Sequence, residues 1–196
     1  MRAGNWLTRE QAEDLLNAPD PSTLKGKRDR ALLGVLLGCG LRRKEAARLT
    51  LDRIQQREGR WVIVDLVGKG ARVRTVPMPS WSKAAIDSWV SAAGIQAGRI
   101  FRAINKGDHI AGESMTAQAV FETVRYYAQE IGVENIAPHD LRRTFAKLAT
   151  RDKRPWSRSS FRSGIARFRP RRYLGVSQNL TDAPCDRLGL RIEVAT

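Results

Sequence analysis

The chain has 196 residues, 42% of them hydrophobic, and its 35 lysines and arginines give a formal net charge of +15. This length predicts one domain with or without a tail, and the apolar content is sufficient for a core. The sequence has no apolar run of about 18 residues and begins without the apolar stretch of a secretory signal, so we expect a cytoplasmic protein that spans no membrane. The excess of positive charge favours a polyanionic partner, most commonly nucleic acid.

The first quarter of the chain predicts helices. Thr8 and Gln11 fit a capping box for a helix that runs to residue 16. A second helix is expected over residues 24–37, ended by two glycines, and a third over residues 42–49. Four residues of the second helix should be buried: Ala31, Leu32, Val35 and Leu36.

The spacing of the apolar residues changes from residue 61 onward. Residues 61–67 predict an apolar strand, which a Gly-Lys-Gly turn joins to a second strand containing Val73 and Val76, so this region is a β-hairpin with a basic tip. Helices are then expected over residues 80–93, 114–131 and 139–149. The predicted fold is mainly α with a small antiparallel β-sheet (α+β), in one domain of residues 1–180 followed by a tail of residues 181–196. The two isolated cysteines, Cys39 and Cys185, indicate buried or incidental thiols rather than a disulfide or a metal site.

Five residues could together act on a phosphodiester: Arg42, Lys69, His139, Arg142 and Tyr173. Such chemistry needs cations around the non-bridging oxygens, an in-line nucleophile and a proton donor for the leaving oxygen. Taken singly, each residue also has a simpler interpretation. Arg42 could pair with Glu45 on a helix surface, Lys69 could be a solvated turn residue, His139 could cap a helix, and Tyr173 is one of three tyrosines.

In this order the residues resemble the catalytic domain of the tyrosine recombinases, the phage integrase family. The resemblance covers residues 7–180. It is carried by GLRRKEAARLTLDRI at 40–54, GKGARVRTVPMP at 68–79, PHDLRRTFAKLA at 138–149 and RYLGVSQ at 172–178. The third segment, which matches the family's H-x-L-R-[HR]-[ST]-F box, is the most specific of the four.

The resemblance implies a role for each residue. Arg42 and Arg142 would hold the scissile phosphate, Lys69 would protonate the leaving 5′-oxygen, His139 would assist proton transfer, and Tyr173 would attack to form a 3′-phosphotyrosyl bond. The chemistry needs no metal, no other cofactor and no small-molecule substrate. The implied partner is double-stranded DNA, on which family members act as homotetramers. Glu45 would orient Arg42, and further DNA contacts are expected from Arg43, Lys44, Arg72, Arg74 and Arg143.

The chain departs from the family pattern in two places. It begins where the family's catalytic domain begins, so we expect the N-terminal DNA-clamping domain to be missing. Residues 150–172 carry nine basic residues and one acidic residue, with almost no aliphatic side chain, where the family has an apolar helix and a second histidine. If the codons of residues 150–165 are read one base earlier, a suitable choice among the degenerate codons encodes HKGQAPLEQIQLSLGH. In the same frame, the codons of residues 166–172 can encode x-x-I-Q-T-T-E. We therefore hypothesise a frameshift near residue 150, compensated near residue 172.

The anomalous segment, with two prolines and many like charges, should be irregular. We expect weak, salt-sensitive DNA binding and little or no cleavage by this chain. Two alternatives stay open. The first is a catalytically dead DNA-binding relic, and the second is an RNA-binding or ribosome-associated basic protein, which only the arginine- and serine-rich segment supports.

Overall fold

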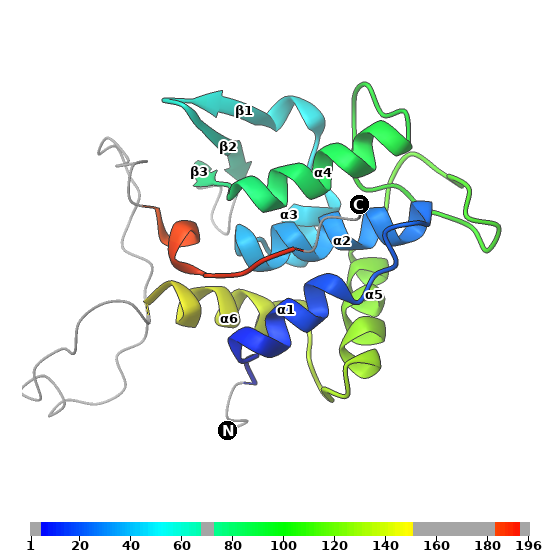
Figure 1. The fold of residues 1–196 in the computed structure, drawn as a ribbon. Helices are drawn as coiled ribbons and strands as arrows, with labels where there is room; N and C mark the ends of the chain where they lie inside the picture. Colours follow the sequence, from blue (N-terminus) through cyan, green and yellow to red (C-terminus); the bar gives the residue numbers. More distant parts are fainter. Residues whose placement is uncertain (1–4, 68–72, 151–182, 193–196) are drawn as a thin grey trace, which may run out of the picture.

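The computed structural model describes residues 5–67, 73–150 and 183–192 (Figure 1). Its α-helices are α1 (Arg9–Asn17), α2 (Leu24–Gly38), α3 (Arg43–Ala47), α4 (Ser80–Ala92), α5 (Ala117–Glu130) and α6 (Pro138–Thr150). Its strands are β1 (Ile54–Arg57), β2 (Arg60–Val67) and β3 (Val73–Pro77), and short 3-10 helices lie at η1 (Leu51–Arg53) and η4 (Pro184–Arg187). The predicted fold class is confirmed. In the described part of the chain, no helix has both the length and the apolar composition needed to cross a bilayer.

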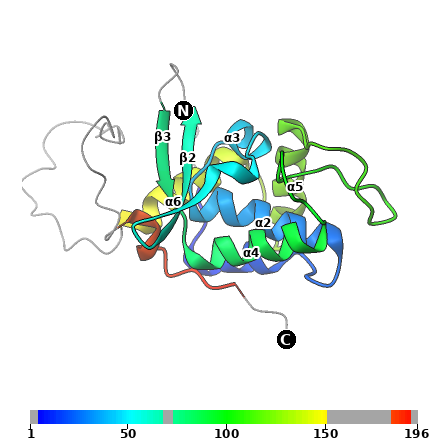
Figure 2. The same ribbon diagram turned by 90° about the horizontal axis from the view of Figure 1, so that it is seen from above.

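Helix α2 is the centre of the core. The four residues predicted to be buried in it are fully inaccessible to solvent. The helix packs against α1, α4, α5 and α6, and Figures 1 and 2 show it between α4 on one side and α6 on the other. Residues 31–38, the second half of α2, include no charged residue and are all buried, so this half is stable only where every face is covered.

The β-hairpin is confirmed, and the sheet has one strand more than the sequence predicted. β2 pairs antiparallel with β3, with Ile63 opposite Val76, and β1 pairs antiparallel with the other edge of β2. The sequence of β1, IQQR, has no apolar alternation, and three of its four residues are exposed. An exposed edge strand of this kind gives no period-two signal, which is why it was missed.

Two helix boundaries also differ from the prediction. The third helix begins after Arg42, whose backbone is extended (φ −78°, ψ 153°), and it ends at Ala47. The fifth helix begins three residues later than expected, because the Thr116 side chain accepts a hydrogen bond from the amide of Ala119 (3.0 Å) and so forms the N-cap.

Both ends of the described chain pack against the core near α6. The backbone amide of Leu7 donates to the hydroxyl of Thr144 on α6 (2.9 Å). Residues 183–192, from the region predicted as a tail, include η4, which contacts α6, and four buried side chains: Ala183, Cys185, Leu188 and Leu190. Cys39 and Cys185 are buried free thiols, as predicted.

Candidate active site

The turn between α2 and α3 determines where Arg42 lies. Helix α2 ends at Gly38, and Gly40 then adopts a left-handed backbone conformation (φ +59°), which glycine alone takes without strain. Leu41 is buried and anchors the turn, and Arg42 follows with 46% of its side chain exposed. The buried Leu41 therefore fixes the backbone from which Arg42 extends into solvent.

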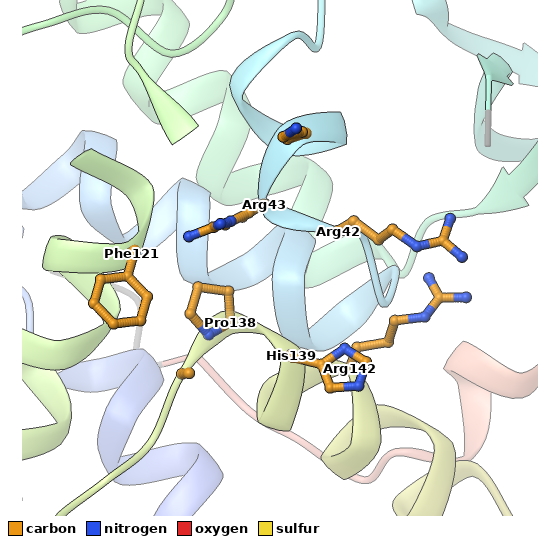
Figure 3. Close-up of a pocket in the computed structure, with 8 residues that line it drawn as sticks. Arg42, Arg43, Phe121, Pro138, His139 and Arg142 are labelled. Carbon is orange, nitrogen blue, oxygen red and sulfur yellow. The ribbon is translucent and has the colours of Figure 1, made fainter. Parts of the chain in front are cut away.

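Helix α6 packs directly against this turn. A Cβ atom placed on Gly40 would lie 2.7 Å from Cδ1 of Phe145, so the absence of a side chain allows the phenyl ring to approach the turn. One turn earlier on α6, the guanidinium of Arg142 donates a hydrogen bond to the Gly40 carbonyl. Figure 3 shows the guanidinium groups of Arg42 and Arg142 next to each other, although the two residues are 100 positions apart in the sequence.

The start of α6 brings His139 to the same site. The Asp140 carboxylate accepts a hydrogen bond from the amide of Ala137 (3.1 Å), so Asp140, rather than His139, provides the side-chain cap of this helix. His139 is exposed and lines the cleft that also contains Arg142. The alternative interpretation of His139 as a cap is therefore wrong.

The cleft has a volume of about 360 Å³ and a basic lining. Its lining residues are Arg42, Arg43, Lys44, Phe121, Ala137, Pro138, His139 and Arg142 (Figure 3). Among the described residues, no carboxylate lines it. Burial, together with the nearby positive charges of Arg42 and Arg74, lowers the pKa of the Arg142 guanidinium from its ordinary value. An anion in the cleft would relieve this repulsion, because it places a negative charge among like positive charges.

Glu45 balances part of this charge, although it does not line the cleft. Its side chain is only 7% exposed. Its carboxylate accepts from the amide of Arg42 (2.9 Å), from the Arg42 guanidinium (2.8 Å) and from both terminal nitrogens of Arg74 (3.0 and 2.7 Å). Burial opposes ionisation of Glu45, but the hydrogen bonds from Arg74 and Arg42 outweigh it, and the pKa of the carboxyl lies below its ordinary value. The pairing of Arg42 with Glu45 is thus real, and it coexists with a place for Arg42 in the cleft.

The other expected contact residues take different positions. Arg43 and Lys44 line the cleft. Arg143 is not among the lining residues and pairs with Asp140 (2.9 Å). Arg74 is engaged by Glu45. Lys69, Arg72 and Tyr173 lie outside the described residues.

Two residues of α5 belong to this surface and were not singled out from the sequence. The ring of Phe121 lines the cleft, and the guanidinium groups of Arg43 and Arg125 lie 6.0 and 5.9 Å from its centre. Both distances are within the range of cation–π attraction. Phe121 and Arg125 are four residues apart on one helix face, and an aromatic–arginine pair at that spacing was the available signal.

Comparison with known proteins identifies the family of the chain independently of the geometry of the cleft. Residues 5–153 match the family described as "Phage integrase family". The chain is 34% identical over 143 residues to tyrosine recombinase XerD of Pseudomonas putida and 35% identical over 147 residues to XerD of Vibrio cholerae. Each alignment covers 71% of this chain and 46% of the relative, so the chain spans about half the length of these curated relatives.

Solved structures share the fold at lower identity. The crystal structure of XerA recombinase matches with a TM-score of 0.57 at 18% identity, over 76% of this chain and 52% of that one. The post-cleavage complex of XerH recombinase with palindromic difH substrate matches with a TM-score of 0.60 at 22% identity, over 76% and 43%. The match to the family covers most of the chain, and it includes the turn of Arg42 and the helix of His139 and Arg142. The chain therefore belongs to the phage integrase family, the enzyme family of the tyrosine recombinases, as its motifs predicted.

Proposed function

We propose that the cleft binds a phosphate of double-stranded DNA and that this chain is the catalytic region of a site-specific DNA recombinase. The observation that carries the proposal is the meeting of Arg42 and Arg142 from two separate elements in one basic cleft, with no carboxylate among the described residues that line it. Two guanidinium groups present paired N–H donors suited to the non-bridging oxygens of a phosphate. The XerH relative is described in complex with its DNA substrate, which supports the choice of ligand.

In the proposed chemistry Tyr173 attacks the phosphorus held by Arg42 and Arg142. A 3′-phosphotyrosyl bond forms, the bond to the 5′-oxygen breaks, and the leaving oxygen takes a proton from Lys69, while the phenolic proton of Tyr173 is lost to solvent in a transfer that His139 assists. The phosphodiester energy is kept in the new bond, so rejoining is the reverse reaction with a second 5′-hydroxyl. Lys69 would act from the hairpin turn, whose flanking residues Val67 and Val73 face each other across β2 and β3. Assembly into a homo-oligomer on DNA is part of the same proposal.

The segment after α6 limits this chemistry. The family match ends at residue 153, close to the point where the arginine-rich segment begins. This agreement supports the proposed frameshift between residues 150 and 172, a region of which only residue 150 is described. We propose that cleavage by the chain as it stands is slow or absent, because an arginine-rich sequence stands where the family has the apolar helix that would position Tyr173. Sequencing the gene across codons 145–175 tests this directly: a codon set that cannot encode the apolar reading would refute the frameshift.

A second candidate function is a DNA-binding relic without cleavage. The observation that favours it is that Arg42, His139 and Arg142, which line the cleft, all precede the anomalous segment. The test uses a library of randomised duplexes with a nick that traps covalent intermediates. It compares the chain as it stands with a repaired chain in which HKGQAPLEQIQLSLGH replaces residues 150–165 and Ile-Gln-Thr-Thr-Glu replaces residues 168–172.

The expected result is a covalent adduct with the repaired chain, none with its Tyr173→Phe variant and little or none with the chain as it stands. An adduct that survives Tyr173→Phe would refute the assignment of the nucleophile. DNA binding is measured separately as a function of salt. An Arg42→Gln, Arg142→Gln double variant should reduce the slope of log affinity against log salt by about 0.9 for each phosphate that the protein no longer neutralises. An unchanged slope would refute the cleft as the phosphate site, and preference for structured RNA would favour an RNA-binding function.

A further inference from the structure

We propose that Arg74 is a positioning residue: it holds and neutralises Glu45 so that Arg42 is presented to the cleft, and it does not itself contact DNA. The proposal goes beyond the proposed function, and it revises the role that the sequence suggested for Arg74. It rests on the phosphate-binding role of the cleft.

The first step is the geometry around Glu45. Arg74 places its two terminal nitrogens on the two carboxylate oxygens, at 3.0 Å from Oε1 and 2.7 Å from Oε2. This two-bond arrangement fixes the plane of the carboxylate as well as its position. The same two oxygens accept from Arg42, Oε1 from its guanidinium and Oε2 from its backbone amide. The carboxylate thus fixes both ends of Arg42, and Arg74 in turn fixes the carboxylate.

The second step is the difference in exposure between the two arginines. The Arg42 side chain is 46% exposed and lines the cleft, whereas the Arg74 side chain is 20% exposed and does not line it. Both terminal nitrogens of Arg74 already donate to Glu45. Glu45 is nearly buried, so moving Arg74 toward a phosphate in the cleft would remove two of the four hydrogen bonds that stabilise this carboxylate, which is unfavourable.

The third step is the balance of charge. Arg42, Arg74 and Arg142 bear three positive charges close to one another, and Glu45 supplies the negative charge among them. Without Arg74, Arg42 would be the remaining strong partner of Glu45 and would have to neutralise it alone. A phosphate in the cleft would then compete with the carboxylate for Arg42. The removal of Arg74 should therefore weaken anion binding through Glu45.

A double-mutant cycle tests this reasoning. The full chain and the variants Arg74→Gln, Glu45→Gln and the double variant are titrated with a short labelled duplex over a range of salt concentrations. Arg74→Gln alone should weaken binding by about tenfold, the equivalent of one charge-assisted hydrogen bond. In the Glu45→Gln background the same change should alter binding by less than about twofold, because no carboxylate is left to hold. Arg74→Lys, which keeps the charge without the two-bond geometry, should fall between Arg74→Gln and the unaltered chain.

The control is Arg43→Gln. Arg43 lines the cleft, and its guanidinium lies against the ring of Phe121 rather than on Glu45, so its effect should be equal in the two backgrounds. If Arg74 contacts phosphate directly, Arg74→Gln will also act equally in both, and the salt slope will fall by about 0.9 in each. That result would overturn the proposal.

A second measurement separates this proposal from the function of the whole chain. Inorganic pyrophosphate probes the cleft without duplex DNA, and the shift in melting temperature that it causes is compared across the same variants. If the unaltered chain binds no duplex, the proposed function fails, and the positioning role is then judged from pyrophosphate alone. Equal reduction of the shift on Arg74→Gln in both backgrounds, or no shift with the unaltered chain, would overturn the positioning role.

Discussion

The turn at Gly40 offers the sharpest test of how the cleft is assembled, and the change is Gly40→Ala. The backbone there has φ +59°, a conformation that is unfavourable for L-residues by roughly 1–2 kcal/mol. The added Cβ would also lie 2.7 Å from Cδ1 of Phe145, with two further ring atoms at 3.1 and 3.2 Å. Forcing the ring aside is an overpacking change, which typically destabilises by about 1–3 kcal/mol. The free energy of unfolding should therefore fall by about 2–5 kcal/mol.

A matched glycine separates the two contributions. Gly94 has nearly the same backbone angle (φ +60°), but a Cβ there meets nothing within 4 Å. Gly94→Ala should show the conformational part alone, about 1–2 kcal/mol. The excess for Gly40→Ala should largely disappear when Phe145→Leu removes the ring, because the two changes share one contact.

The assay is urea denaturation of the unaltered chain and these variants, with duplex binding as a second readout. Gly40→Ala should also weaken DNA binding, because the ring that is displaced belongs to the helix from which Arg142 reaches the Gly40 carbonyl. The reasoning is refuted if Gly40→Ala and Gly94→Ala destabilise equally within about 0.5 kcal/mol. It is also refuted if the excess for Gly40→Ala persists in the Phe145→Leu background.

Three further predictions concern stability and reactivity. Thr144→Val leaves the backbone amide of Leu7 without its buried acceptor and should lower the free energy of unfolding by about 1–3 kcal/mol. Thr144→Ser keeps the hydroxyl and should retain most of the stability of the unaltered chain. Burial raises the pKa of both thiols, that of Cys185 to about 12. Neither Cys39 nor Cys185 should therefore react with a thiol reagent until denaturant is added, and rapid labelling of the native chain would contradict this prediction. The folded pKa of Glu45 is lowered, so its ionisation stabilises the fold above the unfolded pKa of about 4.3 and this contribution disappears at lower pH. The difference in free energy of unfolding between the unaltered chain and Glu45→Gln should accordingly shrink as the pH falls. A difference that is constant with pH would contradict the stabilising role of the ionised Glu45.

The sequence predicted those parts of the fold whose signals are local. The capping box of Thr8 and Gln11 is present, and the apolar run of α2 is buried as expected, because both depend on near neighbours or on a continuous pattern. The strand β1 could not be predicted, because it is defined by pairing with β2 and not by its own side chains. The same holds for residues 183–192, whose burial depends on a surface made by distant helices.

In the candidate site, too, the sequence predicted the residues that lie in motifs and missed a contact between distant segments. Motifs identified Arg42, His139 and Arg142, and the structure brings these three residues into one cleft. Motifs gave no indication that both terminal nitrogens of Arg74 are engaged by Glu45, because that contact joins α3 to β3 across 29 positions of sequence. A basic residue in a basic motif is easily assigned to DNA, and only its partner in three dimensions distinguishes a phosphate contact from a structural ion pair.

The proposed binding and the proposed cleavage would therefore depend on different parts of this chain. Among the described residues, the cleft is lined from the start of α3, from α5 and from the start of α6. The proposed nucleophile, Tyr173, follows the segment whose sequence departs from the family, after the family match has ended. A change of reading frame near residue 150 would leave Arg42 and Arg142 in place and remove the helix that the family pattern has before the tyrosine. Changes at Arg42 or Arg142 should accordingly weaken both binding and any cleavage, whereas restoring residues 150–172 should raise cleavage far more than affinity.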